Sequence, residues 1–423
     1  MRILILSGAI YAKDSKRKYF TGLDYVVTQI GQLLSEGNEV IFFTTSPIGK
    51  KSVVKGCNVY SYSNINLMPY VLKVKFRSYL NALTMDCSLK EKVKNIRSLI
   101  IAEYFEKVIN IEKPNIIHIN GITYGNLLCA DKAKGKYPIA YTLHGLSYTS
   151  NECSDFQKNI ERNFIKNAYE NNLKFSVVSS GVKKIIEADF KGKFNICIIK
   201  NIIDIKDCTE SKEILRKKYG IPKEAKVLIC VGSIGYRKNQ IQVIHAIQLL
   251  PDEYKKNMFI VFAGKNKIKD SFDKEIEKAY LMKQVLITGF VSKNELAKLY
   301  KMADANIVLS KSEGFGLSII EAGYFGLPTI MFEDLDAYED VYFEEGFTII
   351  KDREDKSVAN AIKYTFDTKW NTDVIKQKSK TEESIFKKQY LEFYREVISD
   401  FKFINFDEII KEMESKNEIC SNQ

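Results

Sequence analysis

The chain has 423 residues, 45% of them hydrophobic, which is enough for two globular domains of ordinary size. Its eight cysteines are scattered without a Cys-x-x-Cys pair, which argues against a disulfide framework and a structural zinc site and favours a reducing cytosol. No apolar run approaches the length of a membrane span, and the net charge of +11 comes from the first half alone. Residues 1–200 hold 29 Lys and Arg against 16 Asp and Glu, whereas residues 201–423 hold 35 against 37.

The first half of the chain alternates between short apolar runs and helical patterns. Residues 2–7 and 39–45 read as buried strands around a helix that begins after Gly22 and ends near Gly37. Ser7-Gly8 interrupts the first apolar run too early for a signal peptide. Further strands are expected at 116–119, 139–143, 175–178 and 195–199, with helices at 90–111 and 159–171. This alternation predicts a parallel sheet with helices on both faces.

One segment of this half, residues 70–80, interleaves basic residues with aromatic and aliphatic ones. Lys73, Lys75 and Arg77 stand among tyrosine, valine, leucine and phenylalanine. Such a stretch favours docking on an anionic membrane surface. The protein is therefore expected in the cytoplasm, as a peripheral protein on the inner face of the cytoplasmic membrane. The alternative is a half-buried strand or helix with a solvated lysine face. Nucleic acid is disfavoured as a partner, because no basic recognition motif accompanies the charge.

The alternation restarts in the second half. Strands are expected at 226–231, 258–263, 285–287, 307–309, 329–332 and 347–350, with helices at 239–250, 270–282 and 295–302 and a charged helical region at 355–400. The linker is expected near 201–212. We therefore predict two doubly wound α/β domains, residues 1–202 and 203–383, with a C-terminal helix at about 384–410 packing back on the first. Two such domains facing each other place ligands at the carboxyl ends of their strands.

The most informative motif spans two carboxylates, Glu313 and Glu321, with seven residues between them. A Gly-Phe-Gly loop separates the first acid from a helix that stops near Gly326-Leu327-Pro328, and Ser318 is its candidate cap. Backbone N–H groups at a helix start bind phosphates, and glycines let the backbone approach them. Carboxylates on either side accept hydrogen bonds from sugar hydroxyls. Alternatively, the two acids are a solvated loop acid and a first-turn acid favoured by the helix dipole.

Several segments, in this order, resemble the retaining glycosyltransferases of family 4, which have the GT-B fold, from residue 2 to about 400. They are Pro114-Asn115-Ile116-Ile117-His118, Leu143-His144-Gly145, Asn201-Ile202-Ile203-Asp204, Val231-Gly232-Ser233-Ile234-Gly235-Tyr236-Arg237-Lys238-Asn239, Thr288-Gly289-Phe290-Val291 and the Glu313 to Glu321 motif.

The resemblance implies roles for the matching residues. Lys238 would neutralise the charge of the diphosphate, and Arg237 is a second candidate for this role. Gly232 matches a glycine that an arginine usually follows in the family, so Ser233 departs from the family pattern. Other donor-binding positions are Gly289 and Phe290 at the base, the amides of Gly314, Phe315, Gly316, Leu317 and Ser318 at the phosphates, and Glu321 at the ribose. Glu313 would lie near the transferred sugar, His144 against the donor sugar, and Gly22, in the turn after the first strand, near the phosphates or the acceptor. Catalysis is therefore expected from Glu313, His144 and Lys238.

The other two histidines carry weaker expectations. His118 ends an apolar strand, so a place in the core or rim competes with a ligand contact. His245 lies inside an expected helix and is interpreted as structural or surface.

The implied reaction moves a sugar from a nucleoside diphosphate to a hydroxyl of a glycan or lipid-linked acceptor with retention, in cell-surface polysaccharide or glycolipid synthesis. No cofactor and no metal are expected, since Asp334-Leu335-Asp336 follows the motif region and is interpreted as surface. The alternatives are a GT-B sugar-nucleotide epimerase or hydrolase, and a non-catalytic sugar-nucleotide or glycan-binding subunit. The motifs are expected to bind the diphosphate and ribose, which UDP, GDP and ADP share, so they do not identify the donor. They do not identify the acceptor either.

Overall fold

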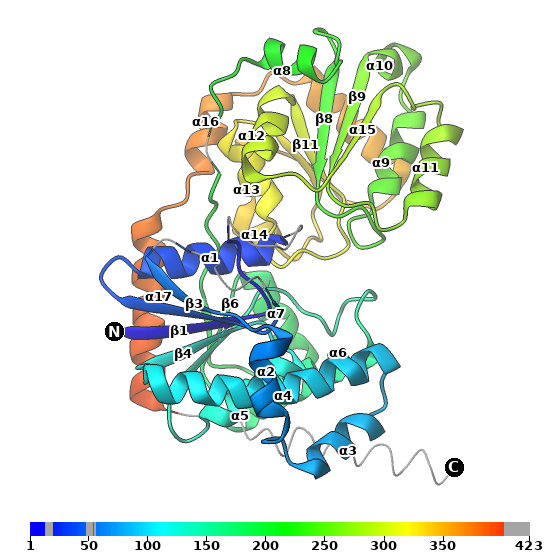
Figure 1. Ribbon diagram of the computed structural model, residues 1–423. Helices are drawn as coiled ribbons and strands as arrows, with labels where there is room; N and C mark the ends of the chain where they lie inside the picture. Colours follow the sequence, from blue (N-terminus) through cyan, green and yellow to red (C-terminus); the bar gives the residue numbers. More distant parts are fainter. Residues whose placement is uncertain (13–19, 48–53, 55, 206, 402–423) are drawn as a thin grey trace. The chain divides into compact units, whose positions relative to one another are not determined.

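The computed structural model describes residues 1–12, 20–47, 54, 56–205 and 207–401. The chain divides into two compact units, each built around its own sheet (Figure 1). Unit 1 comprises Met1–Ile202 and the chain from Glu382 on, and unit 2 comprises Ile203–Thr381. Both sheets are entirely parallel and covered by helices, so the predicted fold class of two doubly wound α/β domains is confirmed.

Unit 1 contains a seven-stranded sheet in the order β3-β2-β1-β4-β5-β6-β7. Its strands are β1 (Arg2–Ser7), β2 (Glu39–Thr44), β3 (Cys57–Tyr60), β4 (Ile116–Asn120), β5 (Ile139–Leu143), β6 (Phe175–Val177) and β7 (Ile196–Ile198). The central strands are nearly continuous apolar runs because helices cover both of their faces. The apolar pattern of the sequence predicted all of them except β3.

The helices of unit 1 begin mostly at capping residues; Thr21, Ser88, Thr123 and Ser154 each accept a backbone N–H through the side chain. They are α1 (Gly22–Leu34), α2 (Asn64–Val71), α3 (Phe76–Thr84), α4 (Leu89–Glu112), α5 (Tyr124–Ala133), α6 (Asp155–Glu170), α7 (Ser180–Asp189) and α17 (Glu383–Asp400). The basic segment 70–80 is therefore the end of α2, a short connection and the start of α3.

The C-terminal helix α17 packs against unit 1, along α1 and β5 (Figure 1). It buries Phe386, Tyr390, Phe393 and Tyr394, at spacings of three and four residues, on one face. The expected helix at 384–410 is observed to Asp400; residues 402–410 lie outside the described part of the chain.

Unit 2 contains a six-stranded sheet in the order β10-β9-β8-β11-β12-β13. Its strands are β8 (Lys226–Val231), β9 (Met258–Ala263), β10 (Val285–Gly289), β11 (Ala305–Val308), β12 (Thr329–Phe332) and β13 (Phe347–Ile350). Its helices are α8 (Lys212–Lys218), α9 (Gln240–Gln248), α10 (Asp252–Asn257), α11 (Lys269–Lys278), α12 (Lys293–Met302), α13 (Leu317–Tyr324), α14 (Tyr338–Val341), α15 (Asp355–Asp367) and α16 (Thr372–Lys378), with a 3-10 turn at Glu344–Gly346.

Two expectations for unit 2 were imprecise. The strand expected at 307–309 begins earlier, at Ala305, because β11 pairs with β8 there. The helical region 355–400 is three separate helices, α15, α16 and α17, and the chain passes back to unit 1 between the last two.

Among the described residues, no helix combines the length and the apolar composition that crossing a bilayer requires. Seven of the eight cysteines lie in this part of the chain, and all seven are free thiols.

Candidate functional site

The two motif segments of unit 2 meet where the strand order reverses. β8 and β11 are neighbours in the sheet, and the chain leaves them toward opposite sides of the strand order. The loop 232–239 follows β8 and the loop 309–316 follows β11. Lys311 N donates a 2.8 Å hydrogen bond to Arg237 O, which joins the two loops. Ligands of open parallel sheets bind at such a switch point, at the carboxyl ends of the strands.

The glycine of the second loop creates the start of α13. Gly316 caps the helix in the left-handed conformation, with φ +78°, which a residue with a Cβ adopts only under strain. No side chain caps this helix, and no acidic residue stands in its first turn. Its first N–H groups are therefore placed for an anion.

The prediction that Ser318 caps the helix was wrong. The turn at Gly316 brings the chain into the helix at Leu317, so Ser318 is already the second helical residue. Its hydroxyl is buried and has no hydrogen-bond partner among the described residues. A buried hydroxyl without a partner at a helix start is an available contact for a bound anion.

Glu313 is a buried acid held by cations and a hydroxyl. Lys238 Nζ donates to its Oε1, Ser310 Oγ donates to the same oxygen at 2.6 Å, and Arg237 Nη1 lies 3.6 Å from it. Burial would raise the pKa of the Glu313 carboxyl, but the charges of Lys238 and Arg237 outweigh that effect and hold the pKa below its ordinary value. The interpretation of Glu313 as a solvated loop acid was therefore wrong.

Glu321 lies one turn into α13 and has a second cation and hydroxyl. Lys293 Nζ, at the start of α12, donates to Oε1 at 2.5 Å, and Tyr300 Oη donates to Oε2 at 3.1 Å. Burial raises the pKa of the Tyr300 hydroxyl well above its ordinary value, so it remains a donor. Glu321 itself is only 4% exposed. The two acids thus precede and follow the α13 start in the sequence, and each is buried and paired with a lysine and a hydroxyl.

The side chain of Lys238 passes close over the backbone of Gly232 on its way to Glu313. Gly232, at φ +135°, has no Cβ, and an added one would lie 2.8 Å from Lys238 Cε. Arg237, the second predicted cation, donates from Nη1 to Ser312 O at 2.7 Å, so it ties the two loops together. Ser233, at the position where the resemblance implies an arginine, is exposed.

The remaining predicted donor positions lie at the ends of neighbouring strands or inside the motif loop. Gly289 ends β10 at φ +66° and bridges to Gly264 after β9, with Phe290 next in the chain. In the motif loop Gly314 is partly exposed, whereas the Phe315 side chain is 5% exposed and packs inside the unit. Phe315 can therefore offer only its amide to a ligand.

His144 of unit 1 follows β5, as predicted, and is half-buried. Its Nε2 is 2.9 Å from Asn120 Oδ1 at the end of β4, and its Nδ1 has no partner among the described residues. Burial lowers the pKa of His144 to about 4, so the ring is neutral at pH 7. A neutral ring with one nitrogen held and the other available can contact a substrate hydroxyl.

The other two histidines have structural surroundings. His118 is fully buried between Thr142 Oγ1 and Tyr394 Oη, each 2.7 Å from a ring nitrogen, which decides for the core alternative. His245 pairs on the surface with Glu275, with its Nε2 3.0 Å from the carboxylate, in agreement with its expected role.

Gly22 stands at the start of the helix that was predicted to begin directly after it. It is the exposed first residue of α1, so the helix begins one residue earlier than predicted, and Thr21 and Asp24 form a capping box around it. The Asp24 carboxylate accepts a 2.7 Å hydrogen bond from Thr21 N, so an acid already occupies this helix start. An anion is therefore disfavoured here compared with α13.

The Asp334-Leu335-Asp336 segment is only partly surface. Asp334 is exposed and pairs with Arg353, whereas Asp336 is half-buried and accepts a 2.7 Å hydrogen bond from Ser312 Oγ. Asp336 thereby supports the motif loop, a role that the sequence did not indicate. Within the described ranges, no group of three or more His, Cys, Asp and Glu side chains could hold a metal ion.

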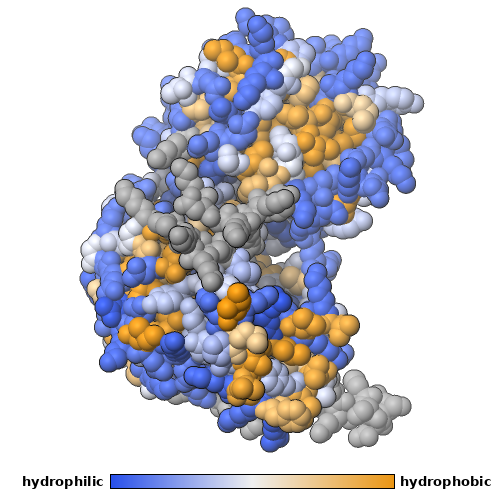
Figure 2. Space-filling view, viewed as in Figure 1, coloured by the Kyte–Doolittle hydropathy of each residue, from blue (hydrophilic) through white to orange (hydrophobic). Residues whose placement is uncertain are grey.

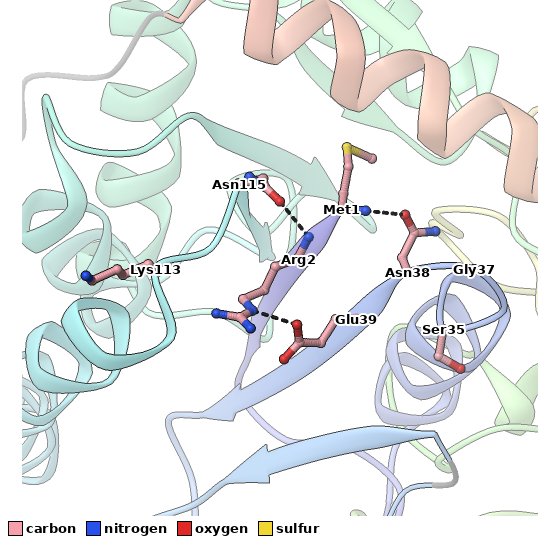
Figure 3. Close-up of a pocket in the computed structure, with 8 residues that line it drawn as sticks. All are labelled: Met1, Arg2, Ser35, Gly37, Asn38, Glu39, Lys113 and Asn115. Atoms are coloured by element: carbon pink, nitrogen blue, oxygen red, sulfur yellow. Dashed lines mark hydrogen bonds and ion pairs between the residues drawn. The ribbon is translucent and has the colours of Figure 1, made fainter.

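A polar depression of unit 1 lies at the amino ends of β1 and β2 (Figure 3). Its groups bond one another: Arg2 Nε is 2.7 Å from Glu39 Oε2, and Arg2 N is 2.7 Å from Asn115 Oδ1. These contacts brace the strand edge. They lie at the opposite end of the strands from the edge where parallel sheets bind ligands.

Comparison with known proteins identifies the second unit. The model of the family "Glycosyl transferases group 1" matches residues 211–381. Residues 211–381, which we call the group 1 domain, thus resemble the group 1 glycosyltransferases. This domain contains both acids, Lys238 and the start of α13.

Similar proteins extend the match beyond the group 1 domain. The chain is 26% identical over 274 residues to alpha-monoglucosyldiacylglycerol synthase of Acholeplasma laidlawii, covering 61% of this chain and 68% of that one. It is 24% identical over 318 residues to N-acetyl-alpha-D-glucosaminyl L-malate synthase of Bacillus anthracis, covering 73% and 75%. Among solved structures, Anabaena HepE in complex with UDP-glucose matches with a TM-score of 0.66 at 16% identity, covering 95% and 99%, which shows the shared fold.

Sequence reasoning missed several residues that build the site of the group 1 domain. Lys293 and Tyr300 hold Glu321 from α12, and Ser310 holds Glu313 from the end of β11. Gln240 is 1% exposed, and its side chain bonds the backbone of the loop after β8. A lysine or a tyrosine in a helix is too common to stand out. The burial of Gln240 likewise cannot be read from the sequence, since glutamine is mostly an exposed residue.

Proposed function

We propose that the protein transfers a sugar from a nucleoside-diphosphate sugar to a hydroxyl of a glycan or lipid-linked acceptor, with retention at the anomeric carbon. The observation that carries the proposal is the start of α13, a helix end without a side-chain cap, with one buried, cation-paired acid before it in the sequence and another after it. The diphosphate would lie at the α13 amides and the Ser318 hydroxyl. The match of residues 211–381 to the group 1 glycosyltransferases and the fold shared with a UDP-glucose complex support this placement.

In the proposed reaction, the bond between the anomeric carbon and the diphosphate oxygen breaks, and the acceptor oxygen bonds that carbon. The acceptor's proton passes to the departing phosphate, so no side-chain base is required. The barrier comes from charge separation, which fixed N–H donors and a cation lower because they need no reorganisation. Lys238 has three N–H donors, and its bond to Glu313 uses one. The ammonium can therefore serve the phosphate without leaving its acid.

The two acids receive different roles in this proposal. Glu321 is the ribose anchor, because its oxygens have room for further hydrogen bonds beside Lys293 and Tyr300. Glu313 is the sugar-side residue; its lowered pKa keeps it ionised, so it can accept from sugar hydroxyls and stabilise positive charge on the ring. His144 is proposed as a further contact of the donor sugar through Nδ1.

We also propose that the reaction needs no metal ion and occurs in the cytosol. Lys238, Arg237 and the α13 amides can supply the positive charge that a cation would give the diphosphate. The free thiols of the described cysteines suit a reducing compartment.

A transfer assay tests the proposal. The full chain is incubated with UDP-, GDP- and ADP-sugars in the presence of EDTA, with and without glycan and lipid-alcohol acceptors, and nucleoside diphosphate release and the anomeric configuration of the product are measured. We expect acceptor-dependent release from one donor and a retained configuration. Release that is independent of any acceptor would favour the epimerase or hydrolase, and no release from any donor would favour the binding subunit.

The Glu313→Gln variant tests the sugar-side role. We expect nucleoside diphosphate binding to persist while transfer falls by roughly 100-fold, because a charge that stabilises the transition state is lost. Ser310→Ala removes a neighbouring hydrogen bond but leaves the carboxylate, and it serves as the matched control with a much smaller loss. Full activity of Glu313→Gln would contradict this role.

A further inference from the structure

Unit 1 exposes a cluster of large hydrophobic side chains on consecutive helices. Eight of the twenty large hydrophobic side chains exposed in the described part of the chain fall between residues 65 and 93. They are Ile65, Met68, Leu72, Phe76, Leu80, Leu83, Leu89 and Val93. Leu72 is 94% exposed and Phe76 75%. Figure 2 shows hydrophobic surface gathered in the region of α2 and α3. Concentrations of this kind mark interaction sites on soluble proteins.

The spacing of these side chains places them on the outer faces of α2 and α3. Ile65, Met68 and Leu72 recur at three and four residues, as do Phe76, Leu80 and Leu83, so each set forms one helical stripe. The opposite faces pack on the unit: Leu67 and Tyr70 of α2 and Ala82 of α3 are buried, and both helices contact α4. A helix that is apolar on its solvent side as well as its inner side needs a second apolar partner.

Cations surround these stripes. Lys73, Lys75 and Arg77 are all exposed in and beside the connection between the two helices. Residues 64–94 hold six lysines and arginines against two acids. Lys73 Nζ lies 5.4 Å from the centre of the Tyr70 ring, so its stem follows the apolar surface while its charge reaches solvent.

We propose that this face, residues 64–94, docks on the surface of an anionic lipid bilayer. The two stripes enter the boundary between headgroups and acyl chains, and the basic residues meet the lipid phosphates. Leu72 and Phe76, at the turn between the helices, insert first, with Lys73, Lys75 and Arg77 next to them. The apolar faces thus match the acyl-chain boundary of a bilayer surface, and the basic residues match its phosphate layer.

The charge of the docking face argues against a second copy as its partner. A two-fold interface places the same surface on both subunits, so it would gather Lys73, Lys75 and Arg77 of both copies in one contact. Like charges facing each other disfavour such a contact. An anionic lipid surface matches both the apolar stripes and the positive charge.

Vesicle binding tests the proposal without using the nucleotide site, so its failure is distinguishable from failure of the proposed transferase function. The full chain is floated with vesicles of phosphatidylcholine, with and without phosphatidylglycerol, at low and high salt. We expect binding to the anionic vesicles only. Salt should weaken binding without abolishing it, because screening acts on the charges and not on the inserted side chains.

Two variants separate the contributions. Lys73→Gln, Lys75→Gln and Arg77→Gln together should weaken binding to anionic vesicles by roughly 100-fold, at about fivefold for each cation. Leu72→Ser with Phe76→Ser should abolish the binding that survives high salt. Both sets of side chains are exposed, so the thermal unfolding of the variants should match that of the wild type.

Matched controls carry the same chemical changes elsewhere. Lys107→Gln, Lys191→Gln and Lys193→Gln remove three exposed cations of unit 1 outside the docking face. Ile111→Ser with Leu249→Ser removes two half-exposed apolar side chains. Both controls should bind vesicles as the wild type does.

Two outcomes would overturn the proposal. One is unchanged vesicle binding in the charge variant and the Leu72/Phe76 variant. The other is a dimer in sedimentation that Leu72→Ser with Phe76→Ser converts to a monomer, without vesicle binding by the wild type, since a second copy would then occupy the face.

Discussion

At the scale of residues, the two acids of the motif share one arrangement. Each buried carboxylate receives one ammonium and one hydroxyl: Lys238 and Ser310 at Glu313, and Lys293 and Tyr300 at Glu321. Such partners stabilise the buried charge, which would otherwise be costly in an apolar interior. They also fix the direction of each carboxylate before a ligand arrives. Positioning of this kind reduces what a ligand must order on binding.

Tyr300 tests this positioning at Glu321. We expect Tyr300→Phe to weaken nucleoside diphosphate binding by about 3- to 10-fold, the usual effect of losing one hydrogen bond of 0.5–1.5 kcal/mol. A 2′,3′-dideoxy nucleotide should bind the variant and the wild type equally, because it lacks the hydroxyls that Glu321 accepts. Titration calorimetry with both ligands measures the difference.

Tyr254→Phe is the matched control for that experiment. Tyr254 also donates its hydroxyl to an acid, Asp367, but in a contact that involves neither motif acid. The control should leave both affinities unchanged. Equal weakening of both ligands in Tyr300→Phe would show a general structural defect and contradict a role at the ribose.

At the scale of elements, the site depends on loops that approach closely at the strand ends. The loops after β8 and β9 touch where Gly264 meets Gly232: a Cβ on Gly264 would lie 2.0 Å from Gly232 O. The Gly232 N–H also donates to Ala263 O at 2.9 Å. The loop that carries Lys238 is thus held against the neighbouring strand. Close packing between Gly264 and Gly232 therefore helps to fix the position of the Lys238 ammonium.

Gly264→Ala tests this approach. We expect it to lower the stability of unit 2 by about 1–3 kcal/mol, because the backbone atoms in contact must move apart. It should also weaken nucleotide binding through Lys238. Gly8→Ala is the control, since a Cβ at Gly8 has nothing within 4 Å and its effect should stay within about 0.5 kcal/mol. Urea unfolding measures both, and equal stability of the two variants would refute the close-packing account.

The sequence predicted the elements better than the contacts between them. Buried strands such as β1 and β8 are continuous apolar runs, and the spacing of the apolar residues after the glycine loop predicted the helix there. Lys293 is 28 residues from the acid it binds, so no local pattern reveals the pair. Serine is a common cap, so the sequence predicts a cap at Ser318, but the left-handed Gly316 occupies the cap position.

At the scale of the whole molecule, the chain returns to its first unit at the end. α17 crosses unit 1 and brings Tyr394 Oη to His118 Nδ1, across 276 residues of sequence. His118 in turn contacts Thr142 on the neighbouring strand. Burial, with a smaller effect of His144, lowers the pKa of His118 to about 3. The core of unit 1 therefore contains a histidine that stays neutral in the folded state.

This histidine predicts a pH dependence. Below an unfolded-state pKa near 6.5, the unfolded chain takes up a proton that the folded state does not, so stability falls as the pH drops from about 6.5 toward 3. The contribution is about 1.4 kcal/mol for each pH unit in that window. His118→Gln should reduce this slope, because it removes the group that takes up the proton on unfolding. Urea unfolding followed by circular dichroism between pH 7 and 5 measures the slope. An unchanged slope in His118→Gln would contradict the prediction.

The most direct test of the central claim, that the start of α13 binds a nucleoside diphosphate through Glu321, is a thermal-shift titration of the wild type and Glu321→Gln with UDP, GDP and ADP. A ligand that binds only the folded state stabilises it by about 2.7 kcal/mol at a hundredfold excess over Kd. We predict that at least one nucleotide raises the Tm of the wild type and that Glu321→Gln loses most of this shift. A wild type that no nucleotide stabilises, or a Glu321→Gln variant that keeps the full shift, would contradict the claim.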